Sequence, residues 1–146
     1  MRRRFAAALA VAALGCNWAT GLVRIASPAD VQLKVGQAAV VDGRLIVRFV
    51  GVPSDSRCPL GAMCIWAGDA EVAITVTLDG GAAEADTLHL MPATNSDTTA
   101  TYIVSLLDLT PYPSTTAPIA ADRYVAQLHV VAYGILTSVE AAPPRR

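Results

Sequence analysis

The sequence predicts an all-β domain, an antiparallel β-sandwich of the immunoglobulin-like kind with about seven strands. Three observations predict it. Apolar and polar residues alternate with a period of two in several short runs, turn-forming residues separate these runs, and no segment after the first 15 residues carries a helical apolar stripe. A partly open β-barrel is the alternative arrangement of such strands.

The first residues have the pattern of a secretory signal peptide. Arg2, Arg3 and Arg4 precede an apolar run over 5–14, which ends at the small residue Gly15. A basic start, an apolar stretch of about ten residues and a small residue near its end are typical of such peptides. The run is too short for a stable membrane anchor, which needs about 20 apolar residues. We therefore expect residues 1–15 to direct export and to be removed.

Cys16 follows the expected leader directly. The residues Ala13-Leu14-Gly15-Cys16 resemble a bacterial lipobox, in which the cysteine is lipidated and becomes the N-terminus. Three cysteines leave one odd thiol after one disulfide, and lipidation of Cys16 removes it. We expect an exported protein, periplasmic or anchored to the membrane through a lipid on Cys16. The alternative is ordinary cleavage and a soluble secreted protein.

Length and charge limit what the rest of the chain does. The sequence predicts an N-terminal tether over 16–28, a single β domain over 29–136 and a flexible C-terminal tail over 137–146. Three of the 11 basic residues lie in the leader, and Lys34 is the only lysine. The remaining chain is mildly acidic and lacks a basic stripe, so we expect no nucleic-acid partner.

The first expected strands form a hairpin and its neighbour. Apolar residues alternate over 31–35, and the apolar runs 40–41 and 45–52 flank Asp42-Gly43. An Asp-Gly pair between two apolar runs predicts a tight hairpin turn, because glycine tolerates positive φ.

Later strands follow the same alternation. We expect strands over 72–78, which ends at Asp79-Gly80-Gly81, over 88–90, and, after a polar loop over 92–99, over 100–107 and 124–131. The segment 109–118 contains three prolines, which lack a backbone donor. It is therefore predicted to cross the surface without joining a ladder.

Two cysteines and a tryptophan are concentrated in the segment 55–68. Cys58 and Cys64 are six positions apart, and in an exported protein this spacing indicates a local disulfide that closes a small loop. We interpret Trp66 as a core or loop-anchor side chain, with ligand stacking as the alternative. Arg57 is expected to bridge the nearby carboxylates of Asp55, Asp69 and Glu71, with contact to an anionic partner as the alternative.

The same segment carries a resemblance to a known family. The runs Asp55-Ser56-Arg57-Cys58-Pro59 and Cys64-Ile65-Trp66-Ala67-Gly68 resemble the D-S-R-C-P…C-x-W-x-G pattern of small bacterial exported proteins and putative lipoproteins of uncharacterised function. A later element, Leu109-x-Pro111-Tyr112-Pro113, is also similar. The resemblance implies a secreted β-rich domain with a disulfide-closed loop. It implies no catalytic residues, because the family has none assigned.

The chain offers little material for catalysis or metal binding. The two histidines, His89 and His129, lie in alternating apolar strands, where a solvent-facing or hydrogen-bonded histidine is ordinary. Motifs for a nucleophile elbow, a zinc protease or a phosphate loop are absent from the sequence. Five residues between two cysteines do not fit structural zinc, and Asn95-Ser96-Asp97 reads as an ordinary turn. We expect no enzyme, no cofactor and no metal.

The function that the sequence favours is a non-catalytic interaction module outside the cytoplasm. Binding residues tend to lie on loops that a rigid scaffold holds, and the predicted ring holds Arg57, Leu60, Met63 and Trp66. We expect these four to form a binding loop for an envelope or extracellular protein or a glycan. The alternatives are a purely structural envelope protein and a small protein resembling a protease inhibitor.

Overall fold

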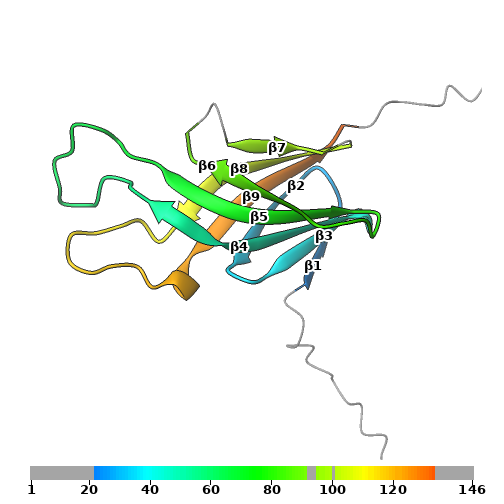
Figure 1. The fold of residues 1–146 in the computed structure, drawn as a ribbon, viewed down its shortest axis with the longest axis horizontal. Coiled ribbons are helices and arrows are strands. Elements are labelled where there is room, and N and C mark those ends of the chain that lie inside the picture. The colour runs from blue at the N-terminus through cyan, green and yellow to red at the C-terminus, as the bar shows by residue number, and fades with distance from the viewer. Residues whose placement is uncertain (1–21, 92–94, 100, 134–146) are drawn as a thin grey trace, which may run out of the picture.

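The computed structural model describes residues 22–91, 95–99 and 101–133. These residues form nine strands and one short 3₁₀ helix, and the strands make two sheets that do not close into a barrel (Figure 1). The predicted all-β sandwich is therefore confirmed. Residues 1–21, including the expected leader and Cys16, and residues 134–146, including the expected tail, lie outside the described residues.

The first sheet has five strands in the order β1-β3-β4-β5-β6. Its strands are β1 (Leu22–Ile25), β3 (Ala38–Val41), β4 (Leu45–Asp55), β5 (Ala70–Leu78) and β6 (Glu84–His89). β1 pairs with β3 in parallel, and the other pairs are antiparallel.

The second sheet has four strands in the order β2-β9-β8-β7, and all its pairs are antiparallel. Its strands are β2 (Ala29–Lys34), β7 (Ser96–Thr98), β8 (Tyr102–Thr110) and β9 (Val125–Ala132). Consecutive strands therefore pair as two meanders, β3 to β6 and β7 to β9. Within the sandwich class, this order differs from that of immunoglobulin constant domains, in which no more than two consecutive strands lie in the same sheet.

The core lies between the inner faces of the two sheets. Val72, Ile74 and Val76 of β5 point inward at every second position, as expected for a half-buried strand. Ala126, Leu128 and Val130 of β9 face them from the other sheet. The Asp42-Gly43 turn joins β3 and β4 with both residues at positive φ, 52° and 72°, as the sequence predicts.

Two strands lie where the sequence predicts none. β1 lies within the expected tether, because Ile25 packs against the core and its backbone pairs with the edge of β3. β7 lies within the expected polar loop over 92–99, where three polar residues pair with β8 without any apolar alternation to reveal them. No helix among the described residues is long and apolar enough to cross a membrane.

Candidate binding loop

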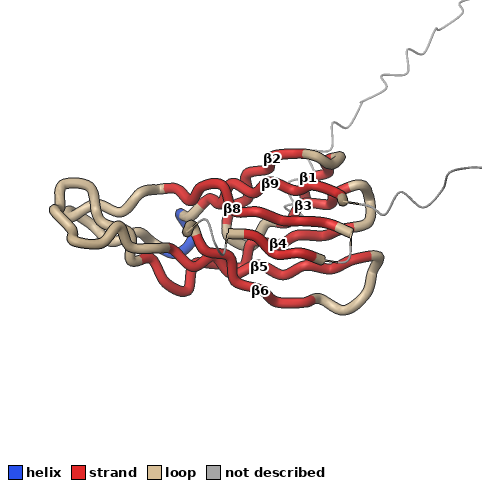
Figure 2. Tube along the Cα trace, turned by 90° about the horizontal axis from the view of Figure 1, so that it is seen from above, coloured by secondary structure: helices blue, strands red, loops and turns tan. Residues whose placement is uncertain are grey.

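Two long connections extend from the same end of the sandwich (Figures 1 and 2). We call residues 56–69, between β4 and β5, the distal loop, and residues 111–120, between β8 and the 3₁₀ helix η1 (Ala121–Arg123), the proline loop. The Leu60 N–H donates to the Pro113 carbonyl at 2.9 Å, and Leu60 forms a parallel bridge with Ser114. The two loops therefore support each other.

The expectation that the segment 109–118 joins no ladder is wrong at its start and in its middle. Leu109 and Thr110 belong to β8, and Ser114 bridges to the distal loop. Prolines lack an N–H but keep their carbonyls, and the carbonyls of Pro111 and Pro113 both accept hydrogen bonds. The prediction considered only the N–H donors that prolines lack and did not consider their carbonyl acceptors.

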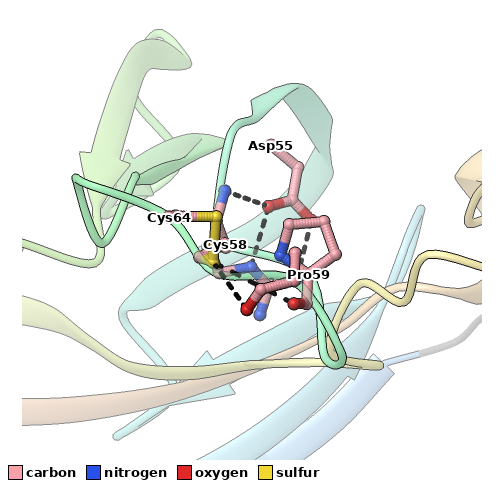
Figure 3. Close-up of a disulfide and its surroundings, with 6 residues drawn as sticks. Asp55, Cys58, Pro59 and Cys64 are labelled. Atoms are coloured by element: carbon pink, nitrogen blue, oxygen red, sulfur yellow. Dashed lines mark hydrogen bonds and ion pairs between the residues drawn. A yellow bond between two sulfur atoms is a disulfide. The ribbon is translucent and has the colours of Figure 1, made fainter.

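The disulfide predicted between Cys58 and Cys64 is present, with their Cα atoms 5.9 Å apart. It closes a ring within the distal loop and lies near Asp55, at the end of β4 (Figure 3). Inside the ring, the Ala62 N–H donates to the Pro59 carbonyl at 3.0 Å. On the side of the ring nearer the sandwich, the Cys58 N–H donates to the Ala67 carbonyl at 2.9 Å. The outgoing and returning arms of the distal loop therefore pair with each other.

Arg57 is the one charged side chain among the described residues that is buried, with 5% of its surface exposed. Its guanidinium donates two parallel hydrogen bonds to the Asp55 carboxylate, at 2.8 and 2.7 Å. It also donates to the carbonyls of Leu109 and Pro111 and lies 4.9 Å from the centre of the Tyr112 ring. Arg57 therefore joins the distal loop to the end of β8 and the start of the proline loop.

A one-residue bulge in β8 contributes to this arrangement. The register with β9 shifts between Leu106 and Asp108, so the exposed Leu107 is the additional residue. The bulge reverses the alternation of faces, and Leu109 points into the core although Tyr102, Val104 and Leu106 set the opposite parity.

In the pair formed by Asp55 and Arg57, each residue stabilises the charged form of the other. Burial alone raises the pKa of Asp55, but its hydrogen bonds with Arg57, the charge of Arg57 and a 3.0 Å bond from the Tyr124 hydroxyl together hold that pKa below its ordinary value. Burial lowers the pKa of Arg57, and the hydrogen bonds and charge of Asp55 more than reverse this. Both groups are therefore charged at neutral pH.

Arg57 has the structural role that we favoured, but with fewer partners than expected. Of the three carboxylates that were predicted to pair with Arg57, only that of Asp55 does so. Asp69 instead hydrogen-bonds His89, at 2.6 Å, and the backbone N–H of Leu90. The interpretation of Arg57 as an exposed residue of the binding loop is wrong, because the carbonyls of β8 and the proline loop draw its guanidinium inward.

Gly68 has a steric reason to be glycine. Its φ is +73°, and a Cβ added there would overlap the carbonyl oxygen of Ser56 and lie 2.9 Å from the Cα of Arg57. The two arms of the loop approach this closely because the Ser56 N–H donates to the Asp69 carbonyl at 2.7 Å. The last residue of the family-like pattern is thus required by backbone packing.

Four large apolar side chains of the distal loop lie in water. The exposed fractions are 62% for Leu60, 103% for Met63, 94% for Ile65 and 81% for Trp66. Trp66 therefore does not enter the core, and our interpretation of it as a core or anchor residue is wrong. We call these four residues the apolar tip. Ile65 was not among the predicted binding residues, although it continues the same uncharged apolar run.

Both histidines are paired with a carboxylate. His89 lies 2.6 Å from Asp69, and His129 of β9 lies 2.6 Å from Asp30 of β2. These are hydrogen-bonded strand histidines, as the sequence predicts. Neither histidine lines the cavity that opens beside the proline loop.

That cavity has a volume of about 450 Å³ and is lined by the proline loop together with Asp55 and Tyr124. The Asp55 carboxylate already accepts hydrogen bonds from the Arg57 backbone and guanidinium and from Tyr124. Its oxygens are therefore occupied. The cavity offers mainly the hydroxyl groups of Ser114, Thr115 and Thr116, two of which bond each other.

Comparisons with protein-family models, with curated proteins and with solved structures find no match to this chain.

Proposed function

We propose that this protein is a non-catalytic binding module that acts outside the cytoplasm and presents the apolar tip of its distal loop to a partner in the bacterial envelope. The proposal rests on one contrast within the distal loop. The residues that build the loop are buried or hydrogen-bonded through their side chains or by their backbone, whereas the side chains of the apolar tip are exposed.

Most residues of the family-like pattern have a structural role in the distal loop. Asp55 and Arg57 pair under the loop, Cys58 and Cys64 close its ring, and Gly68 allows its arms to meet. Trp66 is the exception, because it is largely exposed. Soluble proteins seldom expose several large apolar side chains together unless the surface binds something.

The rigid support favours binding over a purely structural role. A loop held by a ring, a buried ion pair and a neighbouring loop has little conformational freedom left to lose when its tip is bound. A loop that only closed the end of the sandwich would bury its tryptophan and methionine against that end. The leader-like N-terminus and the lipobox-like Cys16 support an exported, lipid-anchored protein.

The test is the affinity of the protein for envelope membranes. A Cys16→Ser form, which carries no lipid, is mixed with purified envelope membranes, and the bound fraction is sedimented. Combined Leu60→Ser, Met63→Ser and Trp66→Ser substitutions are expected to weaken binding at least tenfold, because each removes apolar surface that binding would bury.

The matched control uses exposed apolar residues outside the distal loop. Val50 and Leu107 are each 47% exposed, and their replacement by serine is expected to leave membrane binding unchanged. Equal binding by the wild type and the tip variant would show that the distal loop is not the binding surface.

A further inference from the structure

We infer that the partner of the apolar tip is a neutral lipid surface, into whose interfacial region Met63, Ile65 and Trp66 insert. This inference rests on the proposed function and names the partner of the same loop. Four features of the described residues support it: the distribution of charge, the shape of the tip, the state of its backbone and the identity of its side chains.

Charge is absent from the proline loop and from the projecting part of the distal loop. Residues 58–68 and 111–120 contain no Asp, Glu, Lys or Arg, and the next charges along the chain are the exposed Asp122 and Arg123 of η1. The charges at the base of the distal loop are engaged, Arg57 with Asp55 and Asp69 with His89. A surface without charges enters a lipid interface without the penalty of removing an ion from water.

The opposite end of the sandwich carries charged side chains. The turn after β3 and the turn after β5 carry the exposed ion pair between Arg44 and Asp79, at 2.6 Å. Asp42, beside Arg44 in the same turn, accepts hydrogen bonds from Ser27. The two ends of the strands thus differ: one carries an exposed ion pair, and at the other the projecting parts of both loops carry no charge.

The tip has a convex shape that suits a fluid partner. The side chains of Met63, Ile65 and Trp66 are each at least 81% exposed, so they do not pack together into one flat patch. Figure 1 shows the distal loop extending well beyond the ends of the strands. Lipid tails fill the space around separate projecting side chains, whereas a protein partner would need a matching pocket for each.

The backbone of the ring limits the depth of insertion. The N–H groups of Cys58, Leu60 and Ala62 have carbonyl partners within the two loops. Among the described hydrogen bonds, residues 63–66 donate none from their backbone. Unpaired backbone groups are excluded from the hydrocarbon core, so the tip reaches the headgroup region and the start of the acyl chains. Tryptophan is the residue that most favours this depth.

The fluorescence of Trp66 tests the inference directly. The chain has two tryptophans, so a Trp18→Phe form reports on Trp66 alone. With vesicles of phosphatidylcholine, we expect its emission to shift to shorter wavelength and to be quenched by lipids brominated near the headgroup. Both signals should persist at high salt and without anionic lipid, because no charge takes part.

Matched variants sharpen the result. In the Trp18→Phe background, Met63→Ser with Ile65→Ser is expected to weaken the vesicle-induced shift at least tenfold in lipid concentration, and Val50→Ser to leave it unchanged. Emission that stays at the wavelength of a water-exposed indole would overturn the inference, as would a shift that requires anionic lipid. If tip-dependent binding to envelope membranes remained in that case, the partner would be a protein or glycan and the proposed function would stand.

Discussion

At the scale of single residues, Arg57 shows how one side chain decides the geometry of a loop. It is buried, it pairs with Asp55, and it donates to two carbonyls from a segment more than fifty positions away in the sequence. Its presence next to carboxylates was visible in the sequence, and a bridging role was predicted. Its main-chain partners were not predictable, because only the folded β8 brings the Leu109 carbonyl to it.

We predict that Arg57→Ala destabilises the fold by about 3 to 5 kcal/mol, since it leaves Asp55 as a buried charge without its partner. Chemical denaturation at pH 7 measures the change. Arg44→Ala provides the control, because it breaks an exposed ion pair of similar geometry and is expected to change stability little.

The pH dependence of the same variant gives a further check. The pKa of Asp55 is lowered in the folded state, so its contribution to stability is present above its unfolded pKa and is lost as the pH falls through the folded value. The difference between wild type and Arg57→Ala should therefore shrink on acidification. A constant difference down to strongly acidic pH would mean that packing, and not charge, explains the effect.

Gly68 provides a residue-scale prediction with a close control. Gly68 and Gly80 have almost the same φ, 73° and 72°, but a Cβ at Gly80 meets nothing within 4 Å. Gly80→Ala should cost about 1 to 2 kcal/mol for the left-handed conformation alone. Gly68→Ala should lower the unfolding free energy by clearly more, because it adds an overlap with the Ser56 carbonyl. Equal losses in the two variants would show that the arms of the distal loop separate freely.

At the scale of elements, the disulfide belongs to the distal loop more than to the sandwich. The ring between Cys58 and Cys64 is short, and chain entropy assigns such a ring about 2 to 2.5 kcal/mol. Replacing both cysteines by serine should lower the unfolding free energy by about that amount and leave both sheets intact. Unchanged far-ultraviolet circular dichroism and a moderately lower denaturation midpoint are the expected results, and loss of the β spectrum would contradict them.

The elements also show what sequence reasoning can reach. The strands with clear alternation, such as β5, and the Asp42-Gly43 hairpin were predicted, because burial of one face leaves a period-two pattern. β7 was missed, because three polar edge residues leave no such pattern. The bulge at Leu107 was also missed, since only pairing with β9 reveals an additional residue.

At the scale of the whole molecule, the sandwich was predictable from patterning, whereas its strand order was not. Alternation identifies which residues face a core but does not identify the neighbour of each strand. The candidate site divides in the same way. The ring and its position were predictable from Cys58 and Cys64, but the exposure of Trp66 was not, because an uncharged apolar segment reads equally well as core or as surface.

The described residues thus form a sandwich with two projecting loops, whose outer parts carry no charge and which a ring, an ion pair and the contact between the loops support (Figure 1). The central claim of this account is that the residues that build the distal loop and the residues that bind through it are different. The side chains or backbone groups that build it are buried or bonded, and the side chains of the apolar tip are exposed.

The most direct test is the free energy of unfolding of the combined Leu60→Ser, Met63→Ser and Trp66→Ser variant, measured by chemical denaturation beside the wild type. Each exposed side chain that makes no structural contact is expected to change it by no more than about 0.5 kcal/mol, so the three together by less than about 1.5 kcal/mol. A loss of about 2 kcal/mol or more, of the size expected for a buried apolar side chain, would show that the tip is part of the fold and would contradict the account.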